Sequence, residues 1–281
     1  MRVLVVGSRS FVGRRVAERL RAAHSVETAG RDASAELHLE LGAPASLPAA
    51  GGRRYDAIVH CAASFEPSTP AGMLRNELVN AVGALEVGEL AVRTGCRQLV
   101  LLSTVSVFDE HEGRLRDSYA LSKRHGQENL ELLCRATGIA LCTLCPGGVY
   151  DERGEGRRHQ PLLYHIVDCA RRGADFELHG KADPLRNFLH VDDLVSVVEA
   201  ALVSGLSGSF PVLHPDFHRV QQIAELAFRV FGRGGKVVRA EHKPDLSELR
   251  FPPGGEIFSR IGRLPLVDLE HGLALLRDQL G

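Results

Sequence analysis

The sequence predicts an α/β fold built on a parallel, doubly wound sheet. Two observations predict it: short aliphatic runs alternate with amphipathic helical patterns, and a glycine-containing turn joins the first run directly to the first helical pattern. This alternation is typical of βαβ units, whose parallel strands are covered by helices on both faces. The predicted strands are residues 2–6, 26–29, 37–39, 57–61, 99–103 and 140–145, and the predicted helices between them are residues 12–22, 72–94 and 119–137.

The second half of the chain changes in character after Pro146. Residues 151–160 are polar and rich in glycine, and we expect them to form a mobile loop. Further helical patterns follow at residues 192–204, 220–231 and 268–280. We expect a sheet core and a smaller, partly interleaved cap, with the core formed by residues 1–149 and 187–212 and the cap by residues 150–186 and 213–281.

Composition and charge exclude several classes of protein. A net charge of −1 and a pI near 6.9 leave no basic surface for nucleic acid or an acidic membrane. The first apolar run, residues 3–6, is too short for a secretory signal or for a spanning helix of about 20 residues. Six cysteines without framework spacing and 13 histidines without a ligand pattern predict reduced thiols and no metal. We expect a cytoplasmic protein with neither nucleic acid nor membrane as a partner.

The turn after the first predicted strand has the features of a phosphate-binding loop. Gly7 permits a tight turn, Gly13 permits close packing of helix on strand, and the small Ser10 can donate a hydrogen bond. A pyrophosphate would then lie at the helix N-terminus, beside Phe11 and Val12. The loop predicts a dinucleotide-binding Rossmann sheet, and a purely structural turn between strand and helix is the alternative.

The residues after the second predicted strand bear on which dinucleotide binds. NAD sites normally place a carboxylate at the end of this strand, where it accepts a hydrogen bond from the ribose 2′-hydroxyl. Here the strand leads into Gly30 and Arg31, with no acid before Asp32. Arg31 and Arg9 can both reach a 2′-phosphate, which guanidinium groups bind well. We expect NADP(H), with NAD(H) and two solvated surface arginines as the alternatives.

A tyrosine and a lysine have the spacing needed for proton transfer. Tyr119 and Lys123 lie four residues apart at a predicted helix start, on one face. A nearby ammonium lowers the pKa of a phenol, which can then exchange a proton with a substrate oxygen. The buried strand of residues 99–103 leads into Thr104, and a hydroxyl there can bind the same oxygen. A tyrosine and a lysine at this spacing also occur by chance, so the preceding strand and glycine loop are what strengthen the prediction.

Together these motifs resemble the extended short-chain dehydrogenases/reductases of the NAD-dependent epimerase/dehydratase family, which modify nucleotide sugars. The resemblance covers nearly the whole chain and includes the glycine loop, Thr104, Tyr119, Lys123 and residues 60–63, 80–83, 146–150, 186–193 and 261–265. It implies that Thr104 polarises a carbonyl, that Tyr119 is the acid/base, and that Lys123 binds the nicotinamide ribose and tunes Tyr119. Further cofactor contacts are implied at Glu40, Leu41, Cys61, Ala62, Ala63, Asn80, Pro146 and Val149. We expect residues 190–193 to fasten the returning helix.

Three departures from the family pattern bear on the reaction. Val105 and Ser106 stand where family dehydratases carry an Asp-Glu pair, so sugar 4,6-dehydration is not expected. The interval from Thr104 to Tyr119 is about ten residues shorter than in the family, which predicts a more open or differently gated pocket. Cys145 stands where the family has an arginine.

These observations predict an NADPH-dependent reductase. Its expected small-molecule substrate is a nucleotide-linked keto-sugar, whose carbonyl it reduces. The alternatives are an NAD-dependent nucleotide-sugar epimerase, a non-sugar secondary-alcohol dehydrogenase and a non-catalytic NADP-binding sensor. The family pairs the helices at residues 72–94 and 119–137 with their copies, so we expect a homodimer. The apolar residues that we expect in this interface are Leu74, Leu78, Leu85, Leu90, Leu130, Leu132 and Leu133, with Val79, Val82 and Val87 around the first helix.

Overall fold

The structure, a computed structural model, contains a seven-stranded parallel sheet and describes residues 1–43, 47–48, 51–111 and 114–281. The strand order is β13-β8-β5-β4-β1-β2-β3, and every adjacent pair is parallel. The strands are β1 (Arg2–Val6), β2 (Ser25–Gly30), β3 (Leu37–His38), β4 (Ala57–His60), β5 (Gln98–Leu102), β8 (Ala140–Pro146) and β13 (Gly208–Val212). The order reverses direction after β3, as in a doubly wound Rossmann sheet, so the predicted fold class is confirmed.

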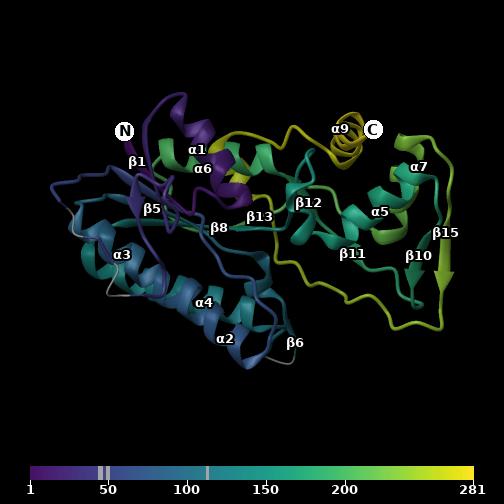
Figure 1. Cartoon of the computed structure of the whole chain (residues 1–281), viewed down its shortest axis with the longest axis horizontal. Coiled ribbons are helices and arrows are strands. Elements are labelled where there is room, and N and C mark those ends of the chain that lie inside the picture. The colour runs from purple at the N-terminus through teal and green to yellow at the C-terminus, as the bar shows by residue number, and fades with distance from the viewer. Residues whose placement is uncertain (44–46, 49–50, 112–113) are drawn as a thin grey trace.

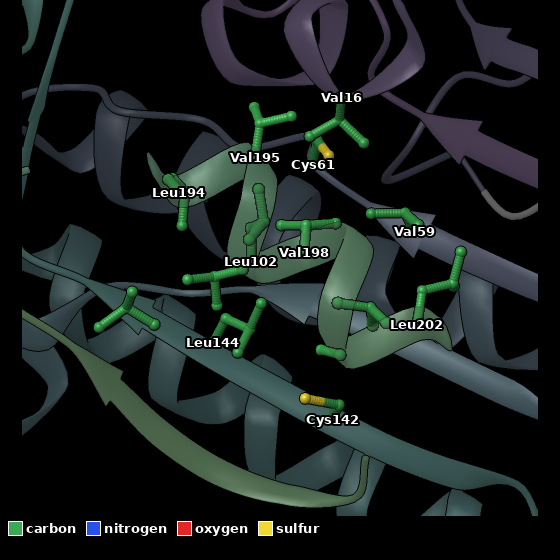
Figure 2. Packing of buried hydrophobic residues seen from close by; sticks show 14 of the residues in the cluster. Val16, Val59, Cys61, Leu102, Cys142, Leu144, Leu194, Val195, Val198 and Leu202 are labelled. Carbon is green, nitrogen blue, oxygen red and sulfur yellow. The ribbon is translucent and has the colours of Figure 1, made fainter. Parts of the chain in front are cut away.

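Helices cover both faces of this sheet, and each face has its own core (Figure 1). Helices α1 (Phe11–Arg21), α6 (Val191–Val203) and α8 (Glu256–Ile261) pack on one face, and α2 (Pro70–Asn76), α3 (Gly83–Arg93) and α4 (Ser118–Thr137) lie on the other. Successive side chains of β1 point into opposite cores: Val3 packs in the same core as Val16 of α1, whereas Leu4 packs in the same core as Leu90 of α3. Figure 2 shows the first core, where Val195 and Val198 of α6 lie over the sheet.

The long helix predicted at residues 72–94 is interrupted. A π-helical segment, η2 (Glu77–Val82), separates α2 from α3. Helix α4 crosses this segment so closely that a Cβ at Gly126 would lie 2.2 Å from the carbonyl oxygen of Asn80. The absent side chain at Gly126 lets the two backbones meet, and π-bulges of this kind are frequent at functional sites.

A second group of elements has a core of its own. Helices α5 (Pro161–Arg172), α7 (Val220–Phe231) and α9 (Leu269–Leu280) pack around Leu163, Ile223 and Leu273, with the parallel pair β10 (Phe176–His179) and β15 (Val237–Ala240) beside them (Figure 1). The remaining short elements are β6 (Glu110–His111), β7 (Arg114–Leu115), β9 (Gly148–Tyr150), β11 (Leu185–Arg186), β12 (Phe188–His190) and β14 (His218–Arg219), with the 3₁₀ turns η3 (Val105–Phe108) and η4 (Glu155–Arg158). The division into cofactor core and cap stays a prediction.

Residues 190–193 fasten α6, the role expected for them. The Asp192 amide donates to Nδ1 of His190, which caps the helix at 3.3 Å. The Asp193 carboxylate accepts the amides of Leu266 (2.8 Å) and Val267 (3.1 Å). The helix is therefore tied at its N-terminus to the segment that leads into α9.

The loop expected to be mobile, residues 151–160, has a defined internal structure. The buried Asp151 carboxylate accepts the amides of Arg153 (3.0 Å), Glu155 (3.1 Å) and Gly156 (2.9 Å). The Tyr164 hydroxyl of α5 also donates to it, at 2.6 Å. One carboxylate thus organises η4 and joins it to the second core.

Replacing Asp151 tests this role. Asp151→Ala leaves a buried phenol and three amides without their acceptor, so we expect the free energy of unfolding to fall by about 2–4 kcal/mol. Urea denaturation followed by circular dichroism measures the change. Glu270→Ala, at an exposed position in the first turn of α9, should stay within about 0.5 kcal/mol. Equal stability of Asp151→Ala and the wild type would contradict the assignment.

Candidate active site

The glycine loop between β1 and α1 has the close backbone contacts that its sequence predicts. Gly7 has a φ of +81°, and a Cβ there would lie 2.6 Å from the backbone of Ala62. A Cβ at Gly13 would lie 2.2 Å from the carbonyl oxygen of Gly7. Both positions therefore exclude any side chain, and the backbone is shaped for the approach of a pyrophosphate.

Ser10 has a different role from the one expected. Its Oγ accepts the amide of Gly13 at 3.0 Å as the N-cap of α1, and its hydroxyl donates to the Cys61 carbonyl oxygen at 3.4 Å. The proton expected to reach a pyrophosphate is already engaged within the protein. Phe11 and Val12 pack partly against the first core, so it is the helix N-terminus, through its backbone amides, that faces the loop.

Two residues predicted to contact the cofactor turn their side chains elsewhere. The Cys61 side chain is 7% exposed and lies in the core between the sheet and α1 (Figure 2), because it continues the inward face of β4. The Asn80 side chain accepts the Ser64 amide (2.8 Å) and donates to the Ser64 carbonyl (2.9 Å) and to Oγ of Ser122 (2.9 Å). The Asn80 side chain positions the β4–α2 loop against α4, and the Cys61 side chain packs in the core; a cofactor contact at either residue stays a prediction.

The other cofactor residues predicted from sequence lie around the carboxyl edge of the sheet. Ala62 adjoins Gly7, Ala63 is exposed, and Leu41 is buried against α3, where a Cβ at Gly83 would lie 2.8 Å from it. Glu40 is exposed beside Leu41. Pro146 ends β8 and Val149 is 8% exposed within the first core, so both present backbone rather than side chain.

Arg9 and Arg31 are both exposed near the end of β2. Arg9 lies 3.6 Å from the Asp32 carboxylate, an ion pair that the sequence did not predict. Arg31 directly follows β2, which ends at Gly30. The structure thus places two guanidinium groups and one carboxylate at the point where a ribose 2′-substituent is recognised in Rossmann sheets.

Thr104, Tyr119 and Lys123 come together, as their spacing predicts. Thr104 follows β5, and its hydroxyl lies close enough to Tyr119, on the first turn of α4, to affect the phenol. Thr104 Oγ1 also donates to Ser106 Oγ and accepts the Ser106 amide, both at 3.2 Å. Lys123, one turn further along α4, is 4% exposed and donates from Nζ to the Leu102 carbonyl at 2.6 Å.

The electrostatics of the pair differ from the prediction. Burial and the charge of Asp117 raise the pKa of Tyr119, and the Thr104 hydrogen bond opposes this only in part. The Lys123 ammonium donates to the Leu102 carbonyl rather than to the phenol. Burial lowers the pKa of Lys123 itself to about 8. Tyr119 is therefore held in its protonated form, which is the form a proton donor needs.

The sequence did not identify the groups that surround Lys123. His60 at the end of β4 is buried beside it, and burial, with the lysine's charge, lowers the pKa of this imidazole to about 3. Cys145 is also close enough to interact with Lys123, and Gln127 donates to its sulfur at 3.4 Å. In the sequence, the four-residue spacing of Lys123 and Gln127 was the signal that could have placed Gln127 on the same helix face as the lysine.

Further expectations concern metals, thiols and membranes. The described part of the chain contains no group of three or more His, Cys, Asp or Glu side chains that could hold a metal ion. All six cysteines are buried and free. Within the same residues, no helix is both long and apolar enough to cross a membrane.

Comparisons with known proteins identify the family. The model of the NAD dependent epimerase/dehydratase family matches residues 3–210. The chain belongs to this family. The resemblance expected from the motifs is therefore confirmed.

Individual relatives are distant in sequence. The chain is 25% identical over 239 residues to UDP-glucuronic acid decarboxylase 1 of Xenopus tropicalis, which covers 78% of this chain and 55% of the relative. It is 25% identical over 202 residues to dTDP-4-dehydro-6-deoxy-D-allose reductase of Streptomyces bikiniensis, covering 65% of this chain and 61% of the relative. The family member thus spans less than two thirds of the length of these curated relatives.

Solved structures share the fold over the whole chain. UDP-glucose 4-epimerase of Thermus thermophilus, in complex with NAD, has a TM-score of 0.80 at 22% identity and covers 99% of this chain and 98% of its own. RMD from Pseudomonas aeruginosa, complexed with NADPH, has a TM-score of 0.82 at 18% identity with the same coverage of 99% and 98%. These likenesses extend the family assignment to the fold and leave the reaction open.

Removing the transferable proton tests the site. Tyr119→Phe keeps the ring and its packing, so cofactor should still bind while turnover falls at least about a hundredfold. Lys123→Met should impair both cofactor binding and turnover, because the ammonium is lost. Fluorescence titration of NADPH and steady-state kinetics separate the two effects. Near-normal turnover of Tyr119→Phe on a reducible substrate would show that another group supplies the proton.

Proposed function

We propose that this protein is an NADPH-dependent reductase of a carbonyl on a nucleotide-linked sugar. The observation that carries the proposal is that Thr104 after β5 and Tyr119 and Lys123 on α4 come together at the carboxyl edge of the sheet. NADPH supplies a hydride when bound. The Thr104 hydroxyl then orients the substrate oxygen, and Tyr119 donates its phenolic proton to that oxygen as the carbonyl carbon becomes a carbinol.

Lys123 supports this chemistry by its position on α4. Its ammonium lies one helical turn from Tyr119 and is buried at the end of β5. After Tyr119 has given up its proton, a cation one helical turn away on the same face stabilises the phenolate electrostatically. On the other side of the site, Gly7 and Ala62 approach so closely that a Cβ at Gly7 would lie 2.6 Å from the Ala62 backbone.

Arg9 and Arg31 support NADP(H) as the cofactor. Both guanidinium groups are solvent-accessible at the end of β2, and neither is buried in a structural contact. A 2′-phosphate offers them charge-assisted hydrogen bonds that a 2′-hydroxyl cannot match. Arg9 can exchange its exposed ion pair with Asp32 at little cost, because such surface pairs contribute about 0–1 kcal/mol.

Three arginines support a diphosphate-bearing substrate. The Arg116 Nε donates to Asp109 at 2.9 Å, the Arg250 amide donates to the same carboxylate at 3.1 Å, and Arg186 donates to the Ser247 carbonyl at 2.9 Å. Burial and the charge of Arg116 lower the pKa of Arg186. Asp109 pairs with the guanidinium of Arg116 and accepts the backbone amide of Arg250. The guanidinium groups of Arg116 and Arg186 lie close enough for their like charges to interact, and Arg116 lies three residues before Tyr119. An anionic group of two charges, such as a sugar-linked diphosphate, would complete this cluster.

An NAD-dependent epimerase is the second candidate, and Asp32 favours it. This carboxylate lies two residues beyond β2 and could accept a hydrogen bond from a ribose 2′-hydroxyl. The epimerase oxidises and re-reduces one carbon and so retains its cofactor. Mass spectrometry of the cofactor released from purified protein distinguishes the two: tightly held NAD indicates an epimerase, and exchangeable NADP(H) a reductase.

The arginine assignment has a direct test. Arg9→Ala combined with Arg31→Ala should weaken NADPH binding by roughly 2–4 kcal/mol, because two charge-assisted contacts are lost. NADH binding should change little. Isothermal titration with each cofactor gives both affinities, and a similar loss for both would reject recognition of a 2′-phosphate by these side chains.

We also propose a two-fold homodimer formed by α2, α3 and α4. Leu74, Leu85 and Leu132 are 61%, 38% and 62% exposed on these helices. Leu90, Leu130, Val79 and Val87 are buried within the protomer and cannot contribute, although the sequence suggested them. The interface therefore rests on fewer residues than expected, on the face turned away from the sheet.

Replacing two of the exposed leucines tests the dimer. Light scattering of the wild type at micromolar concentration should give twice the chain mass of 30.5 kDa. Leu74→Glu with Leu132→Glu should shift the mass towards one chain, because like charges would face each other across a two-fold axis. A wild-type mass near one chain would reject the proposal.

A further inference from the structure

Two asparagine side chains hold the loop between β4 and α2. Asn80 in η2 accepts the Ser64 amide at 2.8 Å and donates to the Ser64 carbonyl at 2.9 Å. Four residues earlier, at the end of α2, Asn76 makes the same two bonds with Glu66, both at 3.0 Å. Each residue that flanks Phe65 therefore has both of its backbone groups bonded to one asparagine amide. We call Asn76 and Asn80 the asparagine clamp.

The same clamp is joined to the helix that carries the catalytic tyrosine. Asn76 donates to Oγ of Ser118 at 3.0 Å, and Asn80 donates to Oγ of Ser122 at 2.9 Å. Both serines are attached to Tyr119. Ser118 precedes it in the chain, and the Ser122 hydroxyl donates to the Tyr119 carbonyl at 3.0 Å. The four-residue spacing of the asparagines matches that of the serines, so the clamp grips the turn of α4 that carries the phenol.

The side-chain amide is the group that this position requires. In each asparagine the oxygen accepts one backbone amide, and the nitrogen donates to one carbonyl and one serine hydroxyl. A carboxylate of the same size has no N–H to donate, and an aliphatic side chain has no polar atom at all. Asn76 and Asn80 are 0% and 3% exposed, so water cannot replace a lost partner.

The clamped loop presents an aromatic ring to the catalytic phenol. The Phe65 ring packs edge to face on Tyr119, with ring centroids 4.7 Å apart and an interplanar angle of 80°. Phe65 is nevertheless 43% exposed, so packing in a core is not what holds its ring. Because the residues on both sides of Phe65 are bonded to the clamp, its backbone has a fixed place beside α4.

We propose that Asn76 is a positioning residue for the catalytic tyrosine. Through Glu66 it holds Phe65 against the phenol, and through Ser118 it holds the first turn of α4. The inference rests on the proposed function in one respect, namely that Tyr119 is the proton donor. A displacement of about 1 Å at a reacting group can cost about a hundredfold in rate. Loss of the Asn76 amide should therefore lower turnover, whereas the phosphate loop between β1 and α1 should still bind the cofactor.

The position of the Tyr119 ring can be measured without turnover. The chain has four tyrosines, so protein labelled with 3-fluorotyrosine gives a small set of ¹⁹F NMR signals, and Tyr119→Phe identifies the one from Tyr119. Phe65→Ala shows where this signal lies once the ring contact is lost. Asn76→Leu has a similar volume but no polar atoms. We expect it to move the Tyr119 signal towards the Phe65→Ala position, while the other three tyrosines keep their signals.

Kinetics separate positioning from binding. The reaction measured is the reduction of UDP-4-ketoglucose by NADPH, with rates divided by the fraction of protein that binds NADPH. We expect kcat of Asn76→Leu to fall about ten- to a hundredfold. The KM of the sugar and the Kd of NADPH should stay within about twofold of the wild type, because the residue contacts neither.

Two further variants separate this role from general damage to the fold. Thr94→Val removes an equally buried hydrogen bond, from Oγ1 to the Leu90 carbonyl at 2.7 Å at the end of α3, and should leave the Tyr119 signal and kcat unchanged. Ser118→Ala removes the oxygen that accepts from Asn76 and keeps a good helix former. It should move the signal and lower kcat by about three- to tenfold. Thermal unfolding shows which variants are folded.

The outcomes distinguish this inference from the proposed function. An unmoved Tyr119 signal in Asn76→Leu would overturn it, and if that variant does not fold, the same result in Ser118→Ala decides. A moved signal with wild-type kcat, or a loss of NADPH affinity larger than the loss of kcat, would reject the positioning role and leave the reductase intact. A wild type that does not reduce the keto-sugar would count against the reductase, and a moved signal would then still support the positioning of Tyr119 by Asn76.

Discussion

Parallel pairing of the seven strands is the constraint on which the site depends. Because every neighbour in the sheet runs in the same direction, all the strands end at one edge. The glycine loop follows β1, Arg31 follows β2, Ala62 lies just past β4, Thr104 follows β5, and β8 ends at Pro146. Residues separated by more than a hundred positions thus meet without any long-range recognition between their side chains.

Helix α4 converts this edge into an acid/base site. Its N-cap, Asp117, accepts the Ala120 amide at 2.8 Å and fixes the first turn that carries Tyr119. One turn later Lys123 is directed to the Leu102 carbonyl, so the helix is attached to β5 by a buried ammonium. Gly126 permits the close crossing with η2, where Asn80 joins α4 to the β4–α2 loop. The position of the phenol is therefore determined from three directions.

Residues 151–159, which we call the strap, add a boundary that the sheet cannot provide. Its ion pairs reach from α1 to the β4–α2 loop, while Asp151 and Tyr164 connect it to the second core. Residues 151–159 therefore contact both groups of elements. In the same way, Arg116 and Arg186 approach each other from segments about 70 residues apart (positions 116 and 186). Asp109 pairs with Arg116, and the charge of Asp183 partly offsets the repulsion that Arg186 experiences.

The sequence by itself determined the parallel sheet, the positions of six of its seven strands to within about one or two residues, the glycine loop and the meeting of Thr104, Tyr119 and Lys123. It did not predict the edge strand β13. These features depend on hydrophobic periodicity, on the steric limits of Gly7 and Gly13, and on a four-residue helical spacing, all of which are local.

Only the tertiary structure decided which polar groups become hydrogen-bond partners. Ser10 caps its own helix, and the Asn80 side chain makes its hydrogen bonds with Ser64 and Ser122. Lys123 donates to a carbonyl instead of the phenol. The ring contact between Phe65 and His159 likewise depends on segments far apart in the chain. Hydrogen bonds and ring contacts are decided by which groups packing brings within a few ångströms, and no local pattern encodes that distance.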